Sequence, residues 1–185
     1  MKYLLQILLI LISCTVTAQS AVKEASADTM AGVNGSSANY ITDNTGEEWF
    51  AVIRVVDGDT FWVDDGSEKG LKIRLIGIDA PEPRNTGTRP KGYFGAESTN
   101  YLQQLLKDNK VRLEYDVSRY DRYGRTLAYA YLENGTFINA ELVRKGFAAV
   151  MTVPPNVKHQ ETFRQLAAKA RRQNKGLWKG APSAK

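Results

Sequence analysis

The pattern of apolar and polar positions predicts five strands and three helices between residues 47 and 185. Alternation with a period of two is typical of half-buried strands, and apolar residues three or four positions apart are typical of helices. The predicted strands cover Ala51 to Val56, Phe61 to Val63, the run that begins at Leu71, Val111 to Val117, and Leu127 to Leu132. The predicted helices run from about Ala96 to Lys107, Phe137 to Lys145 and His159 to Gln173.

The order of these elements predicts a small α+β domain. Strands come first, helices are interleaved with the later strands, and few connections are long. A short barrel of about five strands with helices packed on it accommodates this pattern. The last strand is apolar at nearly every position, so we expect it to be buried on both faces. In the first helix we expect Leu102, Leu105 and Leu106 to form the buried stripe.

The run Leu71 to Leu75 and the residues that follow it place several charged side chains close together in the sequence. Asp79 and Glu82 follow it closely, and we expect both at the end of the strand or in the next loop. Strict alternation would put Arg74 and Asp79 on opposite faces of the strand. If the two side chains share a site, the strand must end or bulge between them, and Gly77 is the natural position for that break.

Asp59 adds a third carboxylate at a defined structural point. The Asp57-Gly58 pair between the first two strands predicts a hairpin turn, so we expect Asp59 to open the second strand. Together with Asp79 and Glu82 it offers hard oxygen ligands, which suit a divalent cation such as Ca²⁺. The sequence has one His and one Cys, which excludes a zinc site of the usual ligand types.

The single histidine, His159, carries little evidence of catalysis. It lies between Lys158 and Gln160 at the predicted start of a helix, where we expect it to face solvent. A hydrolase built on a Ser-His-Asp or Cys-His arrangement is therefore disfavoured.

A second basic point lies in the predicted tight turn Asp121 to Arg125. Arg74 and Arg125 would offer two planar forks for bidentate contacts to phosphate oxygens. A cation, a carboxylate that activates water and two arginine clamps describe the metal-assisted hydrolysis of a phosphodiester.

The charge distribution favours a polyanionic partner. The chain has a formal net charge of +5, and residues 158 to 185 carry eight Lys or Arg against one Glu. The polar loop from Pro83 to Gly92 adds Arg84, Arg89 and Lys91, of which Lys91 is our candidate substrate-binding residue. A basic helix that is simply solvated is the alternative reading of the tail.

The first 46 residues predict an export signal and a flexible tether. The apolar run from Tyr3 to Ile12 is too short to span a bilayer but suits the core of a signal peptide over residues 1 to 21. Val16 to Ala18 offers small residues for a signal peptidase, whereas Leu11 to Cys14 resembles a lipoprotein cleavage box that would place a lipid anchor on Cys14. Residues 22 to 46 have a polar, small-residue composition typical of a tether. We expect an exported monomer, secreted or periplasmic, or anchored to a membrane as a lipoprotein.

Four motifs make the domain resemble the staphylococcal nuclease (thermonuclease) family. They are Val56 to Thr60, Arg74 to Glu82, Asp121 to Tyr129 and Asn139 to Gly146, and the similarity extends from about Val52 to Trp178. The resemblance implies a five-stranded OB-type β-barrel with three helices. It also implies hydrolysis of DNA and RNA with Ca²⁺, leaving 3′-phosphate ends.

The same resemblance assigns roles to individual residues. Asp59 and Asp79 would ligate calcium together with the backbone carbonyl of Ala80, and Glu82 would be the general base. Arg74 and Arg125 would bind the phosphate, and Tyr123 would lie beside the terminal phosphate of the substrate.

This sequence departs from the family pattern at two places. Ala80 replaces a threonine, which matters little if only its carbonyl is used. Met151 to Pro155 stands where the archetype has tyrosines beside the base, and the loss of those rings removes stacking worth about 1–3 kcal/mol per base. Two alternatives remain open: a catalytically weak nucleic-acid-binding module of the same fold, and a structural domain in which the same charges serve turns, loops and a surface ion pair.

Overall fold

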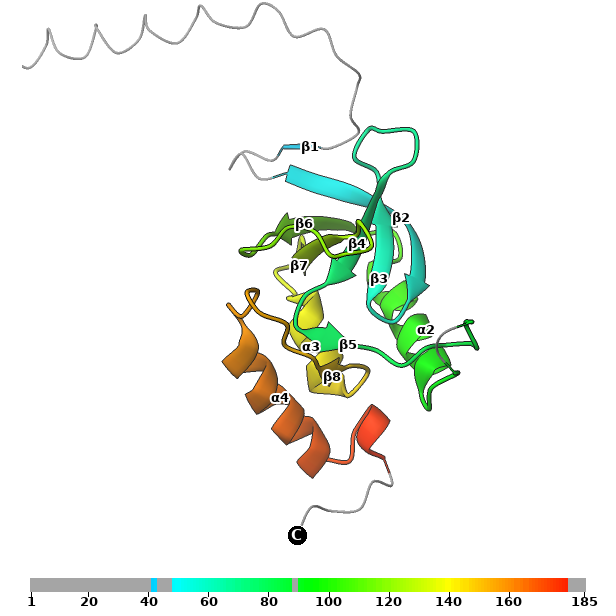
Figure 1. Cartoon of the computed structure of the whole chain (residues 1–185), viewed down its shortest axis with the longest axis vertical. Helices are drawn as coiled ribbons and strands as arrows, with labels where there is room; N and C mark the ends of the chain where they lie inside the picture. Colours follow the sequence, from blue (N-terminus) through cyan, green and yellow to red (C-terminus); the bar gives the residue numbers. More distant parts are fainter. Residues whose placement is uncertain (1–40, 43–47, 88–89, 180–185) are drawn as a thin grey trace, which may run out of the picture. The chain divides into compact units, whose positions relative to one another are not determined.

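Five strands form a closed barrel, as the sequence and the family resemblance predicted (Figure 1). The structure, a computed structural model, describes residues 41–42, 48–87 and 90–179. The strands neighbour one another in the order β2, β3, β4, β7 and β6, and β6 pairs with β2 to close the barrel. Only β4 and β7 are parallel. The strands are β2 (Glu48–Asp57), β3 (Thr60–Val63), β4 (Leu71–Leu75), β6 (Lys110–Glu114) and β7 (Thr126–Leu132).

Short pairings extend this barrel at two places. Two residues, β1 (Ile41–Thr42), pair with the start of β2. The strands β5 (Ile78–Asp79) and β8 (Ala149–Val150) form a separate two-stranded pair. The β5–β8 pair holds the segment after β4, which carries Asp79, against the segment that follows helix α3 (Ile138–Lys145).

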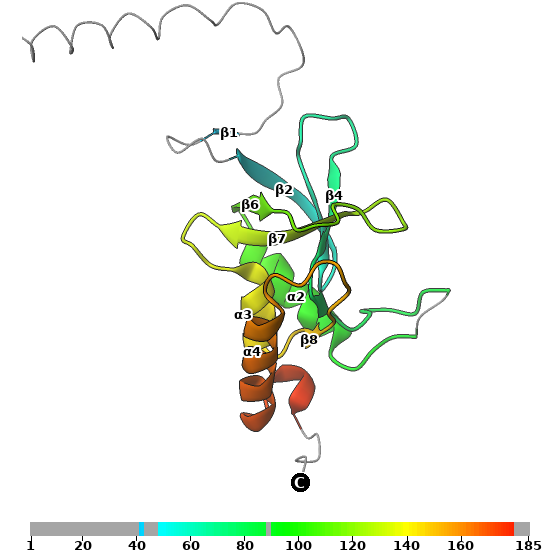
Figure 2. The ribbon, with the colours of Figure 1, turned by 60° about the vertical axis from the view of Figure 1, so that its left-hand side comes forward.

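Three helices cover the barrel, which confirms the predicted α+β fold (Figure 2). Helix α2 (Gly95–Leu106) packs against β2, and α3 (Ile138–Lys145) packs against β7 and α4 (Gln160–Arg172). A short 3₁₀ helix, η1 (Gly176–Trp178), follows. In α2 the predicted stripe is confirmed, since Leu102 and Leu106 are buried and Leu105 is partly buried.

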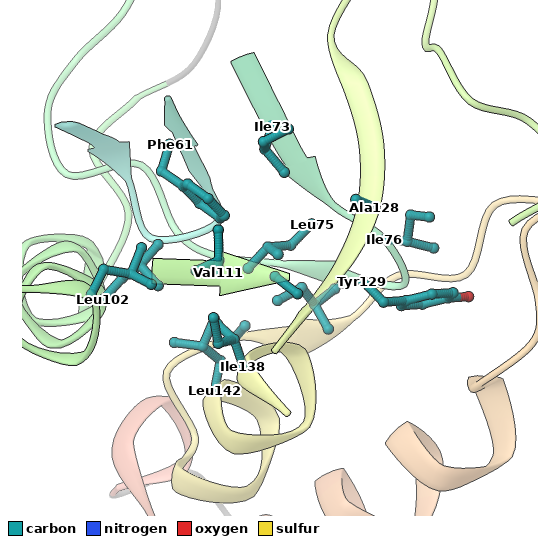
Figure 3. Packing of buried hydrophobic residues seen from close by; sticks show 14 of the residues in the cluster. Phe61, Ile73, Leu75, Ile76, Leu102, Val111, Ala128, Tyr129, Ile138 and Leu142 are labelled. Carbon is teal, nitrogen blue, oxygen red and sulfur yellow. The ribbon is translucent and has the colours of Figure 1, made fainter. Parts of the chain in front are cut away.

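The core fills the barrel and continues between the barrel and α3 (Figure 3). In β3, Phe61 and Val63 are buried and Trp62 between them is less so, as a period of two requires. Most positions of β7 are buried, as expected for its continuous apolar run. Burial of such large apolar side chains supplies most of the stabilisation of the domain. Fully buried residues of this core include Phe61, Ile73, Leu75, Val111, Tyr129, Ile138 and Leu142.

Two boundaries differ from the sequence-based expectation. Asp59 does not open β3, because Asp57 pairs with Thr60 and leaves Gly58 and Asp59 as the two turn residues. The fourth strand ends at Glu114, and Val117 is 75% exposed. The chain leaves the ladder there because Ser118 exchanges hydrogen bonds with the Asn156 side chain, at 2.7 and 2.8 Å.

The expectation that His159 faces solvent is wrong. The imidazole meets the Tyr129 ring edge-on at 4.5 Å, and its Nε2 lies 3.2 Å from Glu114 Oε1. It is half-buried because its ring packs against those of Tyr129 and Phe137. The polar ring nitrogen of His159 therefore lies against the carboxylate of Glu114 rather than in solvent.

The predicted signal peptide, including Cys14, lies outside the described residues, as do Arg89 and most of the predicted tether. Of the tether, only Ile41–Thr42 is described, as strand β1. Within the described part of the chain, no helix combines the length and the apolar character that crossing a membrane requires.

Candidate functional site

A break after β4 brings Arg74 and Asp79 together. Strand β4 ends at Leu75, and Gly77 has a φ of 79°, a left-handed conformation that glycine adopts without strain. The chain then reverses into β5, and Arg74 Nη2 reaches Asp79 Oδ1 at 2.9 Å. The expected interruption at Gly77 is thus confirmed, and it turns two residues of opposite strand parity toward each other.

Arg74 is the hub of this arrangement. Its Nη1 lies 3.0 Å from Asp59 Oδ2, so one guanidinium bridges two carboxylates. The same nitrogen donates to the carbonyls of Leu75 and Ile78, at 3.0 and 2.9 Å. Arg74 is only 6% exposed. It therefore combines the ion pair with a structural link across the reversal between β4 and β5.

Asp59 is buried, and several donors contact its carboxylate. Its Oδ2 accepts from the Ala80 N–H at 2.6 Å, and its Oδ1 accepts from the Thr60 hydroxyl at 3.0 Å. Burial raises the pKa of Asp59, and the neighbouring Asp57 raises it further, whereas Arg74 and the Ala80 hydrogen bond oppose the rise. Negative charge is thus costly here, and another cation beside Asp59 would lower that cost.

The residues present fit a calcium ion in their donor chemistry. Among the described residues, no group of three or more His, Cys, Asp or Glu could hold a metal. A cation would take the carboxylates of Asp59 and Asp79 with the carbonyl of Ala80, and Ca²⁺ accepts such oxygen ligands with water completing the shell. The hydrogen bond from the Ala80 N–H to Asp59 holds these two residues next to each other.

Glu82 is positioned by the segment that leads into α2. Its carbonyl accepts from the Gly92 N–H at 3.0 Å. Gly95, the first residue of α2, passes so close to the Glu82 carbonyl that a Cβ there would clash with it. The backbone of Glu82 is therefore fixed by a buried helix start rather than left in an open loop.

Arg125 is held by the turn that precedes β7. The Gly124 N–H donates to the Asp121 carbonyl at 3.0 Å, which confirms the predicted tight turn. Asp121 Oδ2 lies 2.6 Å from Arg125 Nε, so one edge of the guanidinium is fixed. The Tyr123 ring is 68% exposed, and its hydroxyl accepts from Arg122 Nη2 at 2.7 Å.

One open cavity of about 1060 Å³ collects most of the predicted residues. It is lined by Asp59, Arg74, Ala80, Glu82, Tyr123 and Arg125. Asp79 joins this group through its ion pair with Arg74. Lys91 is not among the described residues that line the cavity, and it lies exposed in the loop with its N–H donating to Asn85 Oδ1 at 2.7 Å.

The cavity also contains residues that we did not select from the sequence. Trp62, Lys72 and Tyr120 line it, and Tyr120 is 61% exposed. Met151 and Val153 occupy the segment where the family archetype has tyrosines, and both line the cavity. For Trp62 and Lys72 the only available sequence signal was their outward position in alternating strands.

Comparisons with known proteins agree with this geometry. The family model described as "Staphylococcal nuclease homologue" matches residues 72–180. A thermonuclease of Staphylococcus hyicus is 42% identical over 136 residues, which are 73% of this chain and 78% of that protein. A thermonuclease of Staphylococcus intermedius is 38% identical over 74% of this chain and 79% of its own length. Endonuclease YhcR of Bacillus subtilis (strain 168) is 33% identical over 72% of this chain, but this match covers only 12% of that protein. The motifs, the barrel and these relatives together show that the chain belongs to the family of staphylococcal nuclease homologues.

Proposed function

We propose that this protein is an exported, calcium-dependent nuclease that hydrolyses phosphodiester bonds of DNA and RNA and leaves 3′-phosphate ends. The observation that carries the proposal is the meeting of Arg74, Arg125 and Glu82 around one open cavity, where Arg74 also contacts the carboxylates of Asp59 and Asp79. The relatives named as thermonucleases and as an endonuclease support the same reaction class.

In the proposed reaction, water attacks phosphorus and the bond from phosphorus to the 5′-oxygen breaks. Glu82 orients the water and accepts its proton, while the leaving oxygen takes up a proton and departs as a 5′-hydroxyl. Arg74 and Arg125 bind phosphate oxygens, where negative charge builds up in the transition state. The tight packing of Gly95 against the backbone of Glu82 supports this role, because a base must be held in position to act.

Asp59, Asp79 and the carbonyl of Ala80 would hold the calcium ion. A calcium ion at this point supplies positive charge close to the phosphate. Arg74 already lies against both carboxylates, at 3.0 Å from Asp59 and 2.9 Å from Asp79, so the two ligands are oriented before a cation arrives.

We further propose that Tyr123 lies beside the terminal phosphate. Its hydroxyl is already fixed by Arg122, and the Arg125 guanidinium carbon lies 5.5 Å from the centre of its ring. Two cations and a hydroxyl on one short turn that lines the cavity form an anion-binding group. Lys91 would contribute from the neighbouring loop as a long-range charge rather than as a lining residue.

The test is incubation of the purified protein with single-stranded DNA and with single-stranded RNA, in Ca²⁺ or in excess chelator. We expect cleavage of both in Ca²⁺, little in Mg²⁺, which holds its waters tightly, and none in chelator. The products should accept a 5′-label without prior dephosphorylation, as 5′-hydroxyl ends do. Full activity in chelator would contradict calcium dependence, and binding without cleavage in Ca²⁺ would favour the binding-only module.

A further inference from the structure

Strands β2, β3 and β4 lie side by side (Figure 1). Arg54, Trp62 and Lys72 form a row across these three strands, which we call the Trp62 row. Arg54 in β2 pairs with Trp62 in β3, and Trp62 pairs with Lys72 in β4. Residues paired in this way project from the same face of a sheet. The Arg54 guanidinium carbon lies 4.9 Å from the centre of the indole, and Lys72 Nζ lies 5.9 Å from it.

The Trp62 row leads directly into the candidate active site. Trp62 and Lys72 both line the cavity. In the parallel register between β4 and β7, Ile73 pairs with Thr126. One position earlier along the chain lie Lys72, within β4, and Arg125, directly before β7. The row thus continues toward a residue that we assign to phosphate binding. Three strand spacings separate Arg54 from that end, or about 14 Å.

The composition of the Trp62 row matches the chemistry of a single nucleic-acid strand. Its two cations can neutralise phosphates, and its indole offers a flat apolar surface on which a base can stack. Trp62 is only half-buried although it is a large aromatic residue, and its outward position follows from the inward positions of Phe61 and Val63. Its Nε1 is buried and has no hydrogen-bond partner among the described residues, so the part of Trp62 left for an external contact is the ring and not the N–H.

We propose that the Trp62 row is an extended binding surface for single-stranded DNA or RNA, which holds the part of the strand that runs out of the cavity over the barrel. The inference rests on the proposed substrate class and extends it to the strand beyond the reacting phosphate. Stacking on Trp62 would also replace part of the base contact that tyrosines supply in the archetype at the positions of Met151 to Pro155.

The primary test is the salt dependence of binding, which requires no turnover. The Kd for a fluorescent twelve-nucleotide single strand is measured by anisotropy in chelator at several salt concentrations, with a gel to show that the strand stays intact. For Arg54→Gln and for Lys72→Gln we expect the slope of log Kd against log salt to fall by about 0.7 each, the value for one lost phosphate contact with a single strand. For Trp62→Leu we expect the slope to persist while Kd rises about 10-fold.

Arg112→Gln is the matched control. Arg112 lies 4.5 Å from the centre of the Tyr131 ring, so it makes the same kind of contact on the barrel, but it does not line the cavity. Its replacement should leave both slope and Kd near the wild-type values. Unchanged slopes for Arg54→Gln and Lys72→Gln, or an equal change for Arg112→Gln, would overturn the proposal. The two charge variants test the row even if Trp62→Leu does not fold.

A second readout separates this proposal from the proposed nuclease activity. The values of kcat/KM are compared for a labelled dinucleotide and for the twelve-nucleotide strand in Ca²⁺. We expect Trp62→Leu to lower kcat/KM for the long strand at least 5-fold more than for the dinucleotide. If the wild type cleaves both substrates and Trp62→Leu shows no such difference, the proposal for the Trp62 row is refuted and the proposed nuclease activity stands. If the variants show the expected salt slopes but the wild type cleaves neither substrate, the proposed nuclease activity is refuted and the binding surface stands.

Discussion

Replacement of Arg74 by methionine should destabilise the protein strongly, and for a reason that the structure makes specific. Methionine keeps much of the side-chain volume but removes the charge that faces Asp59. The two side chains are each only 7% exposed, so the remaining carboxylate would lie buried without a counter-charge. Breaking a buried pair in this way costs about 3–5 kcal/mol. The contact with Asp79 adds little to this figure, because that side chain is 34% exposed and screened by water.

A double variant tests whether the unpaired charge is the cause. In Arg74→Met with Asp59→Asn, both partners are neutral, and removal of a whole buried ion pair is often close to neutral for stability. We expect the free energy of unfolding, measured with urea at pH 7, to recover by at least half of the loss seen for Arg74→Met alone. Lost hydrogen bonds to Leu75 and Ile78 would account for the remaining deficit.

Arg144→Met provides the comparison for an exposed ion pair. Arg144 lies 2.6 Å from Glu141, but its side chain is 46% exposed, so we expect a loss of at most about 1 kcal/mol. A loss below about 1 kcal/mol for Arg74→Met would refute the reasoning, as would a double variant no more stable than the single one.

Four further outcomes are expected. Glu82→Gln should lower kcat by about 100-fold or more with little change in substrate affinity; normal turnover in a folded, calcium-binding variant would remove the proposed mechanism. Arg125→Lys should lose nearly as much activity as Arg125→Ala, since lysine keeps the charge but lacks the fork, and a nearly silent lysine variant would argue against bidentate binding. Ca²⁺ with a nucleotide should raise the melting temperature, because both bind the folded state, and no shift would speak against the site. Burial acts to raise the pKa of Asp116, but hydrogen bonds from Lys158 N–H and the Tyr129 hydroxyl lower it below 3.8. The stabilisation that the ionised Asp116 contributes is therefore present above pH 3.8 and is lost as the pH falls through its lowered pKa. Asp116→Asn should cost stability at pH 7 and flatten the acid limb of a urea-unfolding series, whereas an unchanged acid limb would contradict this origin.

The sequence was most informative where one short segment determines the outcome. Alternation predicted β4 and the start of β6, because side-chain direction in a strand depends only on position, and a continuous apolar run predicted β7. The break at Gly77 followed from the need to bring Arg74 and Asp79 together. Asp59 was predicted to open β3 but is the turn residue directly before it. The reason is that the pairing of Asp57 with Thr60 depends on the partner strand and not on the turn residues alone.

Features that depend on distant segments were not predictable in the same way. The burial of His159 requires α4 to dock beside Glu114, 45 residues earlier in the chain. Trp62 and Lys72 become neighbours only through the register between β3 and β4, which alternation within each strand does not determine. The position of Lys91 likewise depends on the path of its loop, and the structure leaves it outside the residues that line the cavity.

Arg74 has two roles, in the ion pairs of the site and in the backbone link after β4, and this affects how catalytically inactive relatives of this domain can be recognised. Because its guanidinium also links the carbonyls of Leu75 and Ile78, a related domain without catalytic activity would still need this arginine to hold the reversal between β4 and β5. The presence of Arg74 is thus a poor marker of an active enzyme. Glu82 and Arg125 are the residues to which the proposed reaction gives proton transfer and phosphate binding, so their loss in a related sequence is the more informative sign of a domain that binds nucleic acid without cleaving it.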